Sequence, residues 1–279
     1  MIDIKTALTH GHTTLLKTSP SSRIDAEMLL LYILKQPRTY LYTHPETLLT
    51  THQWQAYQHL IHQRSLGHPV AYLTQSKEFW SLPLMITEKT LIPRPETELL
   101  VELTITLLNT FTDARILDLG TGSGAIALAL ASERPTWHIL AIDDSEEALE
   151  IARHNASNLN LNQIKFLQSN WFTSITKETF HAIISNPPYI AENDIHLQQG
   201  DIRFEPRKAL TSGINGLDAL NDIIKTAITF LLPGGFLLVE HGFDQKEAVA
   251  ALFQQYGYVK IQSYQDIVGN DRVTGGFRA

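Results

Sequence analysis

Residues 118–124 read Asp-Leu-Gly-Thr-Gly-Ser-Gly, and this stretch decides the fold of the chain. The residues before it, from Ile116, are apolar and typical of a buried strand, and residues 125–132 after it are rich in Ala and Leu, as expected of a helix. Glycines at such a junction let the backbone turn sharply, approach a ligand closely and seat the helix on the sheet. The stretch therefore predicts a strand–loop–helix unit of an α/β sheet, with a ligand site in the loop.

Strands and helices alternate along the rest of the chain, which is the pattern of a parallel sheet. The expected strands are 116–119, 139–142, 165–168, 182–185, 236–240, 259–263 and 272–277. The expected helices include 125–132, 146–158 and 245–256. We therefore interpret residues 96–279 as one α/β domain.

Residues 1–75 have a different pattern and predict helices. One helix is expected after the serine pair at 21–22, and its buried face would carry Ile24, Met28, Leu31 and Leu34. A second helix is expected to begin after Thr51 and to end at Gly67, with Trp54, Tyr57 and Ile61 on one face. We interpret residues 1–75 as a helical substrate-recognition domain.

Residues 76–95 predict a β-hairpin linker, made of two short strands around a bend at Pro83. The linker runs into Ile-Pro-Arg-Pro-Glu-Thr-Glu at 92–98, where prolines on both sides of Arg94 keep the backbone extended. The net charge changes at about the same place, from +2 over residues 1–75 to −9 over residues 76–279. These changes place the domain boundaries near residues 75 and 95.

The composition excludes several classes of protein. The 279 residues include 22 Lys and Arg against 29 Asp and Glu, and the net charge of −7 disfavours stable binding of nucleic acid. The absence of Cys excludes disulfides and thiolate zinc sites, and the His pairs at 10 and 12 and at 59 and 62 lack carboxylate partners, so no metal site is expected. The chain shows no signal-peptide pattern and no apolar run of membrane-spanning length. We expect a cytoplasmic monomer with no membrane partner.

The ligand of the glycine loop is predicted to be S-adenosylmethionine. The spacing of Gly120, Gly122 and Gly124 differs from that of dinucleotide-binding loops, and Asp118 suits a cationic ligand better than a pyrophosphate. Asp143 ends the next strand, where a carboxylate can accept hydrogen bonds from both ribose hydroxyls. Together these features indicate an adenosyl ligand without a phosphate chain.

Asn170 and Trp171 follow the third strand, at the edge of the sheet where adenine would lie. The Asn170 carbonyl can accept a hydrogen bond from the adenine amino group, and Trp171 can cover a ring. A second interpretation of Trp171, as a core residue, stays open.

Residues 186–189 read Asn-Pro-Pro-Tyr and follow the fourth strand, at the edge where open α/β sheets bind ligands. The loop suits methyl transfer to a planar –NH2 group, whose delocalised lone pair makes it a poor nucleophile. The Asn186 side-chain oxygen and the Pro187 carbonyl can accept hydrogen bonds from its two N–H groups. These hydrogen bonds would stabilise the positive charge that develops on the nitrogen. The prolines lock the turn and remove competing N–H donors, and Tyr189 offers a flat face.

With these motifs in this order, the chain resembles the HemK-type (PrmC) release factor glutamine methyltransferases, a family of class I S-adenosylmethionine-dependent enzymes. The resemblance spans nearly the whole chain. Besides the glycine loop, Asp143, Trp171 and the Asn-Pro-Pro-Tyr loop, it rests on the segments 23–27, 64–72, 92–98, 203–206 and 269–273.

The resemblance implies a Rossmann-like α/β fold, with a seven-stranded methyltransferase sheet whose last strand is antiparallel. It implies that the acceptor is the glutamine amide of the Gly-Gly-Gln loop in class 1 peptide chain release factors, which gives N5-methylglutamine. By motif match, the cofactor would be contacted by Gly120, Thr121, Gly122, Ser123, Gly124, Asp143, Trp171 and Asn186. The catalytic residues would be Asn186, Pro187 and Tyr189, and Pro188 would join them in binding the glutamine.

The sequence departs from the family pattern at two places, and three other functions stay open as alternatives. Asn170 stands where many relatives are expected to have Asp, which bears on cofactor affinity, and the chain end at 275–279 is looser than the usual pattern. Adenine-N6 methyltransferases of nucleic acid can use an Asn-Pro-Pro-Tyr loop in the same way, because their acceptor is also a planar –NH2 group. The net charge of −9 over residues 76–279 disfavours this function. Ribosomal-protein glutamine methyltransferases share most motifs, although the linker at 92–98 favours the release-factor branch. The intact loop at 186–189 disfavours a protein that binds S-adenosylmethionine without catalysis.

Overall fold

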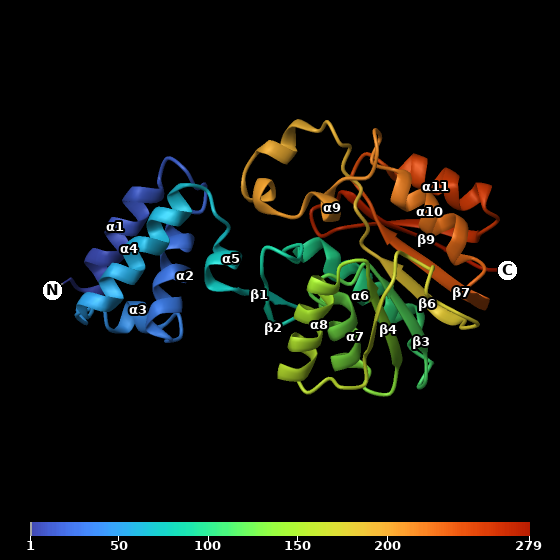
Figure 1. Cartoon of the computed structure of the whole chain (residues 1–279), viewed down its shortest axis with the longest axis horizontal. Coiled ribbons are helices and arrows are strands. Elements are labelled where there is room, and N and C mark those ends of the chain that lie inside the picture. The colour runs from blue at the N-terminus through green and yellow to red at the C-terminus, as the bar shows by residue number, and fades with distance from the viewer. Residues whose placement is uncertain (1) are drawn as a thin grey trace. The chain divides into compact units, whose positions relative to one another are not determined.

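The computed structural model describes residues 2–279 and shows two compact units (Figure 1). The helical unit consists of the residues up to Ser76 and of a separate segment, His196–Phe204. The sheet unit consists of Lys77–Ile195 and Glu205–Ala279. Segment 196–204 lies in sequence within the predicted methyltransferase domain, yet it groups with the helices. Within residues 2–279, no helix combines the length and apolar character that crossing a membrane requires.

The helical unit is built on five helices, two of which begin with side-chain caps. The Asp3 carboxylate accepts a hydrogen bond from the Thr6 amide at 2.8 Å, and Thr50 forms a capping box with Gln53. The helices are α1 (Ile4–Leu15), α2 (Ser22–Leu34), α3 (Tyr40–Thr43), α4 (Thr51–Ser65) and α5 (Val70–Thr74). Their shared core includes Ile4, Leu15, Leu29, Leu30, Tyr57 and Ile61.

The buried face of α2 differs from the predicted one. Ile24 and Met28 are 51% and 45% exposed, so the prediction that they face the core is wrong. Asp25 and Glu27 are buried instead, at 5% and 3% exposure. Arg64 of α4 pairs with Asp25, with its Nε 2.6 Å from the carboxylate. Glu27 pairs with Arg23 of the same helix and with Arg38. The buried face also carries Ala26, Leu29 and Leu30, and a pattern of apolar residues does not identify a face on which buried ion pairs stand among them.

The sheet unit contains a seven-stranded sheet in the order β5-β4-β3-β6-β7-β9-β8, which confirms the predicted fold. All neighbouring pairs are parallel except those of β9, which is antiparallel to both β7 and β8. The strands are β3 (Arg115–Leu119), β4 (His138–Asp143), β5 (Lys165–Gln168), β6 (Phe180–Ser185), β7 (Leu231–Glu240), β8 (Val259–Gln265) and β9 (Asp271–Phe277).

Helices flank this sheet, with α7 and α8 next to each other and α10 packed against α11 (Figure 1). The sequence analysis did not identify α10, although its apolar residues face the core at helical spacing. The helices are α6 (Glu98–Leu107), α7 (Ala125–Glu133), α8 (Glu146–Asn158), α9 (Arg207–Leu210), α10 (Asp218–Ala227) and α11 (Lys246–Gln255). Short 3₁₀ turns are η1 (Pro95–Thr97), η2 (Ile195–Gln198) and η3 (Asp201–Phe204).

The predicted hairpin forms, but its turn lies two residues earlier than expected. Strands β1 (Ser76–Phe79) and β2 (Leu82–Met85) are joined by Trp80 and Ser81, whose φ angles are 52° and 60°. Two consecutive left-handed residues are the requirement of a type I′ turn. Pro83, expected at the bend, lies within β2. The Trp80 amide donates to Glu98 at 2.8 Å, which holds this turn in place.

Asn155 of α8 joins the hairpin to the glycine loop. Its side chain is 1% exposed, and its Oδ1 accepts a hydrogen bond from the Met85 amide at 2.7 Å. Its Nδ2 donates to the carbonyls of Met85 and Ser123, both at 3.0 Å. One side chain therefore satisfies three backbone groups on two segments far apart in sequence.

Asn155→Ala is expected to lower the free energy of unfolding by about 1–3 kcal/mol, because it leaves buried backbone groups without a partner. Urea denaturation measures this change. The matched control is Asn158→Ala, which alters an exposed position of the same helix and should stay within about 0.5 kcal/mol of the wild type. Equal losses for the two variants would contradict the joining role of Asn155.

Candidate functional site

The candidate site lies where the strand order of the sheet reverses. From β3 the chain continues outward through β4 and β5, and β6 then pairs with the other side of β3. Leu119 and Ser185 are partners at the ends of β3 and β6, and the Ser185 hydroxyl donates to the Leu119 carbonyl at 2.8 Å. The loops that follow these two strands therefore begin side by side, at the kind of edge where open α/β sheets bind ligands.

The glycine loop after β3 adopts a backbone that favours glycine. Gly120, Gly122 and Gly124 have φ angles of +74°, +56° and +88°, a region that residues with a side chain rarely occupy. A Cβ added to Gly124 would lie 3.3 Å from that of Ala152 in α8, whereas one added to Gly122 would meet no atom within 4 Å. Gly124 thus serves helix packing, and Gly122 leaves open space.

Asp143, at the end of β4, organises this loop. Its Oδ2 accepts from the Gly122 amide at 2.8 Å, and its Oδ1 accepts from the Ser145 amide at 2.9 Å. Burial raises the pKa of its carboxyl, and the two backbone hydrogen bonds oppose that shift. The structure therefore brings Asp143 to the loop as predicted from its place in the sequence, and adds a loop-ordering role. Its contact with a ribose stays a prediction.

Asp118, at the end of β3, is fully buried. Its Oδ2 accepts from the Thr121 hydroxyl at 2.6 Å, whereas its Oδ1 is buried without a hydrogen-bond partner. Burial raises the pKa of this carboxyl to about 7, and the Thr121 hydroxyl and the Ala127 backbone amide oppose that shift. An unsatisfied buried carboxyl oxygen beside the loop fits a ligand that carries positive charge.

The Trp171 ring lies against the glycine loop. A Cβ added to Gly120 would be 3.5 Å from a ring carbon of Trp171. Trp171 has a φ of +47° and its carbonyl accepts from the Ser169 hydroxyl at 2.8 Å, which helps to hold this uncommon backbone. The ring also packs against the core cluster of the sheet. Both interpretations of Trp171 thus have structural support, whereas Asn170 is exposed.

The Asn-Pro-Pro-Tyr loop after β6 is held by two residues that the sequence analysis did not place in the site. Asn186 Nδ2 donates to the Thr97 hydroxyl at 3.0 Å, and that hydroxyl donates to Glu240 at 2.7 Å. The Tyr189 hydroxyl donates to the other oxygen of Glu240 at 3.2 Å. Only weak signals in the sequence pointed to Thr97 and Glu240. Thr97 lies in the linker motif, which indicates a connection between domains and not a site, and Glu240 ends a strand, as many structural residues do.

Burial dominates the electrostatics of this loop. Glu240 is 1% exposed, and burial raises its pKa to about 7, although the hydrogen bonds from Thr97 and Tyr189 act in the opposite direction. Burial likewise raises the pKa of the Tyr189 hydroxyl, and the neighbouring Glu240 adds to that shift. The phenol therefore remains a hydrogen-bond donor.

Glu205 fixes the linker that precedes Thr97. Its side chain is fully buried, accepts from the Ile92 amide at 3.1 Å and pairs with the Arg94 guanidinium. The backbone that leads to Thr97 is therefore held at two points. Arg94 therefore helps to hold the linker through its ion pair with Glu205.

Comparisons with known proteins agree with this arrangement. A family model described as the methyltransferase small domain matches residues 96–213, and one described as the PrmC N-terminal domain matches residues 6–74. The release factor glutamine methyltransferase of Shewanella oneidensis is 48% identical, and the match covers 98% of this chain and 95% of that protein. This chain belongs to the release factor glutamine methyltransferase family.

Another member of the family, from Salmonella typhimurium, is 49% identical over 96% of both chains. Among solved structures, the Thermus thermophilus 16S rRNA N2 G1207 methyltransferase in complex with AdoMet and guanosine has a TM-score of 0.53. That match has 18% identity and covers 73% of this chain and 50% of the other, so it shows the fold alone. The curated relatives and the family model together make this chain a methyltransferase.

Asp143→Ala is expected to weaken binding of S-adenosylmethionine by roughly 1.5–3 kcal/mol, the range for hydrogen bonds to a charged group. The loss combines a missing carboxylate with a loosened Gly122 amide. Isothermal titration calorimetry measures it. Asp144→Ala, at the exposed neighbouring position, is the control and should bind normally. Unchanged affinity in folded Asp143→Ala would remove this residue from the site.

Proposed function

We propose that this chain transfers a methyl group from S-adenosylmethionine to the side-chain amide nitrogen of the glutamine in the Gly-Gly-Gln motif of class 1 peptide chain release factors. The product is N5-methylglutamine. The observation that carries the proposal is the Asn186–Tyr189 loop beginning beside the glycine loop where the strand order reverses. The names of the relatives, which match nearly the whole chain, support the choice of acceptor.

The residues around the glycine loop fit S-adenosylmethionine. The open space at Gly122 allows close approach, the unpartnered Asp118 oxygen suits a cationic ligand, and Trp171 offers an aromatic face beside Gly120. We assign cofactor binding to the residues predicted for it, namely Gly120, Thr121, Gly122, Ser123, Gly124, Asp143, Trp171 and Asn186. When bound, S-adenosylmethionine supplies an electrophilic methyl group on a sulfonium.

The Asn-Pro-Pro-Tyr loop orients the acceptor amide and stabilises the charge that it develops. An amide nitrogen is a poor nucleophile because its lone pair is delocalised into the carbonyl. Asn186 Oδ1 and the Pro187 carbonyl accept hydrogen bonds from the two N–H groups of the acceptor amide. These bonds orient the nitrogen lone pair and stabilise the positive charge that develops on the nitrogen. Pro188 lacks an N–H that would compete, and the Tyr189 ring packs against the planar amide.

Mass spectrometry of a class 1 release factor, incubated with the enzyme and S-adenosylmethionine, tests the activity. We expect a single methyl group on the Gly-Gly-Gln glutamine, weak labelling of a Gly-Gly-Gln peptide and none of duplex DNA or ribosomal protein. Asn186→Ala should cut the rate by about 10²–10³, the cost of losing one preorganised partner of developing charge. Labelling of DNA or ribosomal protein above that of the release factor would overturn the proposal.

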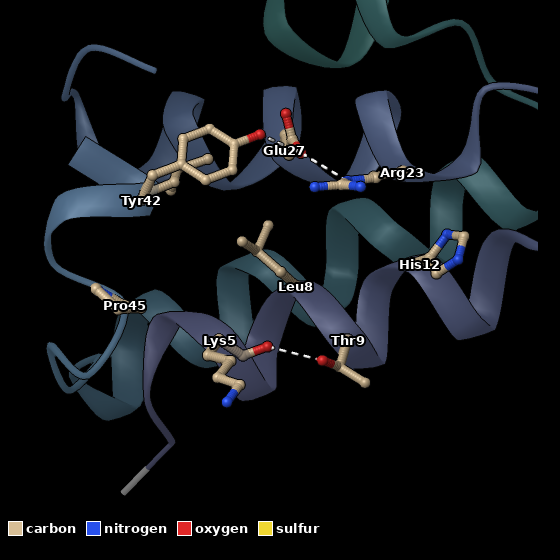
Figure 2. Close-up of a pocket in the computed structure, with 9 residues that line it drawn as sticks. Lys5, Leu8, Thr9, His12, Arg23, Glu27, Tyr42 and Pro45 are labelled. Carbon is tan, nitrogen blue, oxygen red and sulfur yellow. Dashed lines mark hydrogen bonds and ion pairs between the residues drawn. The ribbon is translucent and has the colours of Figure 1, made fainter. Parts of the chain in front are cut away.

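The helical unit is proposed to recognise the release factor, since remote contacts position a reacting group that the loop alone would not select. Figure 2 shows its candidate docking pocket, a cavity of about 390 Å³. Leu8 of α1 points into it, Tyr42 of α3 leans over it from the opposite side, and Arg23 and His12 lie at one end. The Tyr42 hydroxyl donates to the buried Glu27 at 2.8 Å, so the aromatic ring is presented in a fixed position.

Tyr42→Ala should raise the KM for an intact release factor roughly 5–30-fold, because exposed aromatic anchors contribute about 1–2 kcal/mol at interfaces. The KM for a Gly-Gly-Gln peptide, which lacks the rest of the release factor, should not change. Tyr32→Ala, on α2 outside the pocket, is the matched control. A point substitution is preferred to deletion of residues 1–75, which would leave segment 196–204 without its helices. Equal KM values for Tyr42→Ala and the wild type would contradict docking at this pocket.

A further inference from the structure

Three side chains from separate elements of the sheet unit form a chain of hydrogen bonds beside the catalytic loop. Asn186 follows β6, Thr97 ends η1 and Glu240 ends β7. Asn186 Nδ2 donates to Thr97 Oγ1 at 3.0 Å, and Thr97 Oγ1 donates to Glu240 Oε2 at 2.7 Å. We infer that Glu240 is a positioning residue that sets the orientation of the Asn186 side-chain amide through the Thr97 hydroxyl. The inference rests on the proposed function of Asn186.

The direction of each bond follows from the number of protons available. A hydroxyl group carries a single proton, and Thr97 gives it to Glu240, so Thr97 can only accept from Asn186. The NH2 side of the Asn186 amide must therefore face Thr97, and Oδ1 lies on the opposite side of the amide. Oδ1 thereby remains available as the acceptor for a substrate N–H.

Glu240 performs this role only as a carboxylate. Its Oε1 accepts from the Tyr189 hydroxyl at 3.2 Å while its Oε2 accepts from Thr97. A carboxylate has no proton to give, so both hydroxyls donate to it, whereas a protonated carboxyl would give its own proton to one of them. The same carboxylate therefore positions both Asn186 and the Tyr189 ring, which are the two side chains proposed to hold the acceptor amide.

The charges around Glu240 predict that this arrangement changes near neutral pH. Burial raises the pKa of Glu240 to about 7, Glu96 adds to the shift, and the Thr97 and Tyr189 hydrogen bonds and Arg272 oppose it. Below that pH the protonated carboxyl donates to Thr97, and the proton of the Thr97 hydroxyl becomes free to point at Asn186. The Asn186 amide then turns Oδ1 toward Thr97, away from the substrate.

The first test uses a pair of substitutions at Thr97. Thr97→Val keeps the shape but removes the hydroxyl, so kcat on the release factor should fall about 10–100-fold, a part of the 10²–10³ expected for losing the acceptor altogether. KM and the Kd for S-adenosylmethionine should change little, and Thr97→Ser should restore most of kcat. A kcat within twofold of the wild type in Thr97→Val, or an equal loss in Thr97→Ser, would overturn the inference.

The second test uses Glu240→Gln and the dependence of kcat on pH. The wild type should lose activity as pH falls through about 7, and this acid limb should disappear in Glu240→Gln because its side chain does not titrate. This comparison is needed because Asp118 also titrates near pH 7. Above pH 8 the variant should be slower yet no less stable to heat, since burying an ionised carboxyl is unfavourable. A lower melting temperature together with an unchanged pH profile would indicate a merely structural role and overturn the inference.

The third test observes Asn186 without any acceptor present. The ¹⁵N resonance of its side-chain NH2, assigned by its absence in Asn186→Ala, should shift with a midpoint near pH 7 in the wild type and stay constant in Thr97→Val. Such a shift without methylation of any glutamine acceptor would overturn the proposed function but support the positioning of Asn186 by Glu240 through Thr97. Methylation of the release factor without the shift would overturn this positioning role alone.

Discussion

Strands β3 and β6 pair in parallel over Ile116–Leu119 and Ala182–Ser185, and each feature of the site depends on this pairing. Because parallel strands end at the same edge, the pairing brings a loop from residue 120 beside a loop from residue 186. The hydrogen bond from Ser185 to the Leu119 carbonyl holds the two strand ends together at the last position of the ladder. Asp143 then reaches the glycine loop through the Gly122 amide, and Thr97 and Glu240 hold the Asn-Pro-Pro-Tyr loop.

The same edge gathers two buried carboxyl groups, Asp118 and Glu240, and the half-buried Asp143, at the ends of β3, β7 and β4. Burial raises the pKa of each, which means that keeping them ionised opposes folding at neutral pH. Apolar residues of similar size would be favoured if stability were the only requirement. Carboxyl groups with raised pKa values, concentrated at one edge of a sheet, indicate a functional site.

Most of the sheet could be predicted from the sequence, because its strands are short apolar runs and its loops carry distinctive glycines and prolines. The hydrogen bonds that join Asn186, Thr97 and Glu240 were not predictable in this way, because Thr97 and Glu240 are far apart in the chain and the linker motif around Thr97 gives no sign of this partner. The wrong face of α2 has a similar cause, because the ion pair of Asp25 with Arg64 exists only after α2 and α4 have packed. The sequence analysis placed the hairpin turn wrongly because Trp80 and Ser81 adopt a left-handed backbone, for which a glycine is the usual sequence signal.

The grouping of segment 196–204 with the helices has a consequence for synthesis on the ribosome. Buried Arg64 pairs with Asp25 and with Asp201, and Asp201 is translated 137 residues after Arg64. At a translation rate of about 5–20 residues per second, the nascent helices wait roughly 7–27 s for this partner. During that interval Leu197, which is 3% exposed in the finished chain, is also missing from its place. The N-terminal helices are thus made first but completed late, and a slow step in translation before residue 204 prolongs their unfinished state.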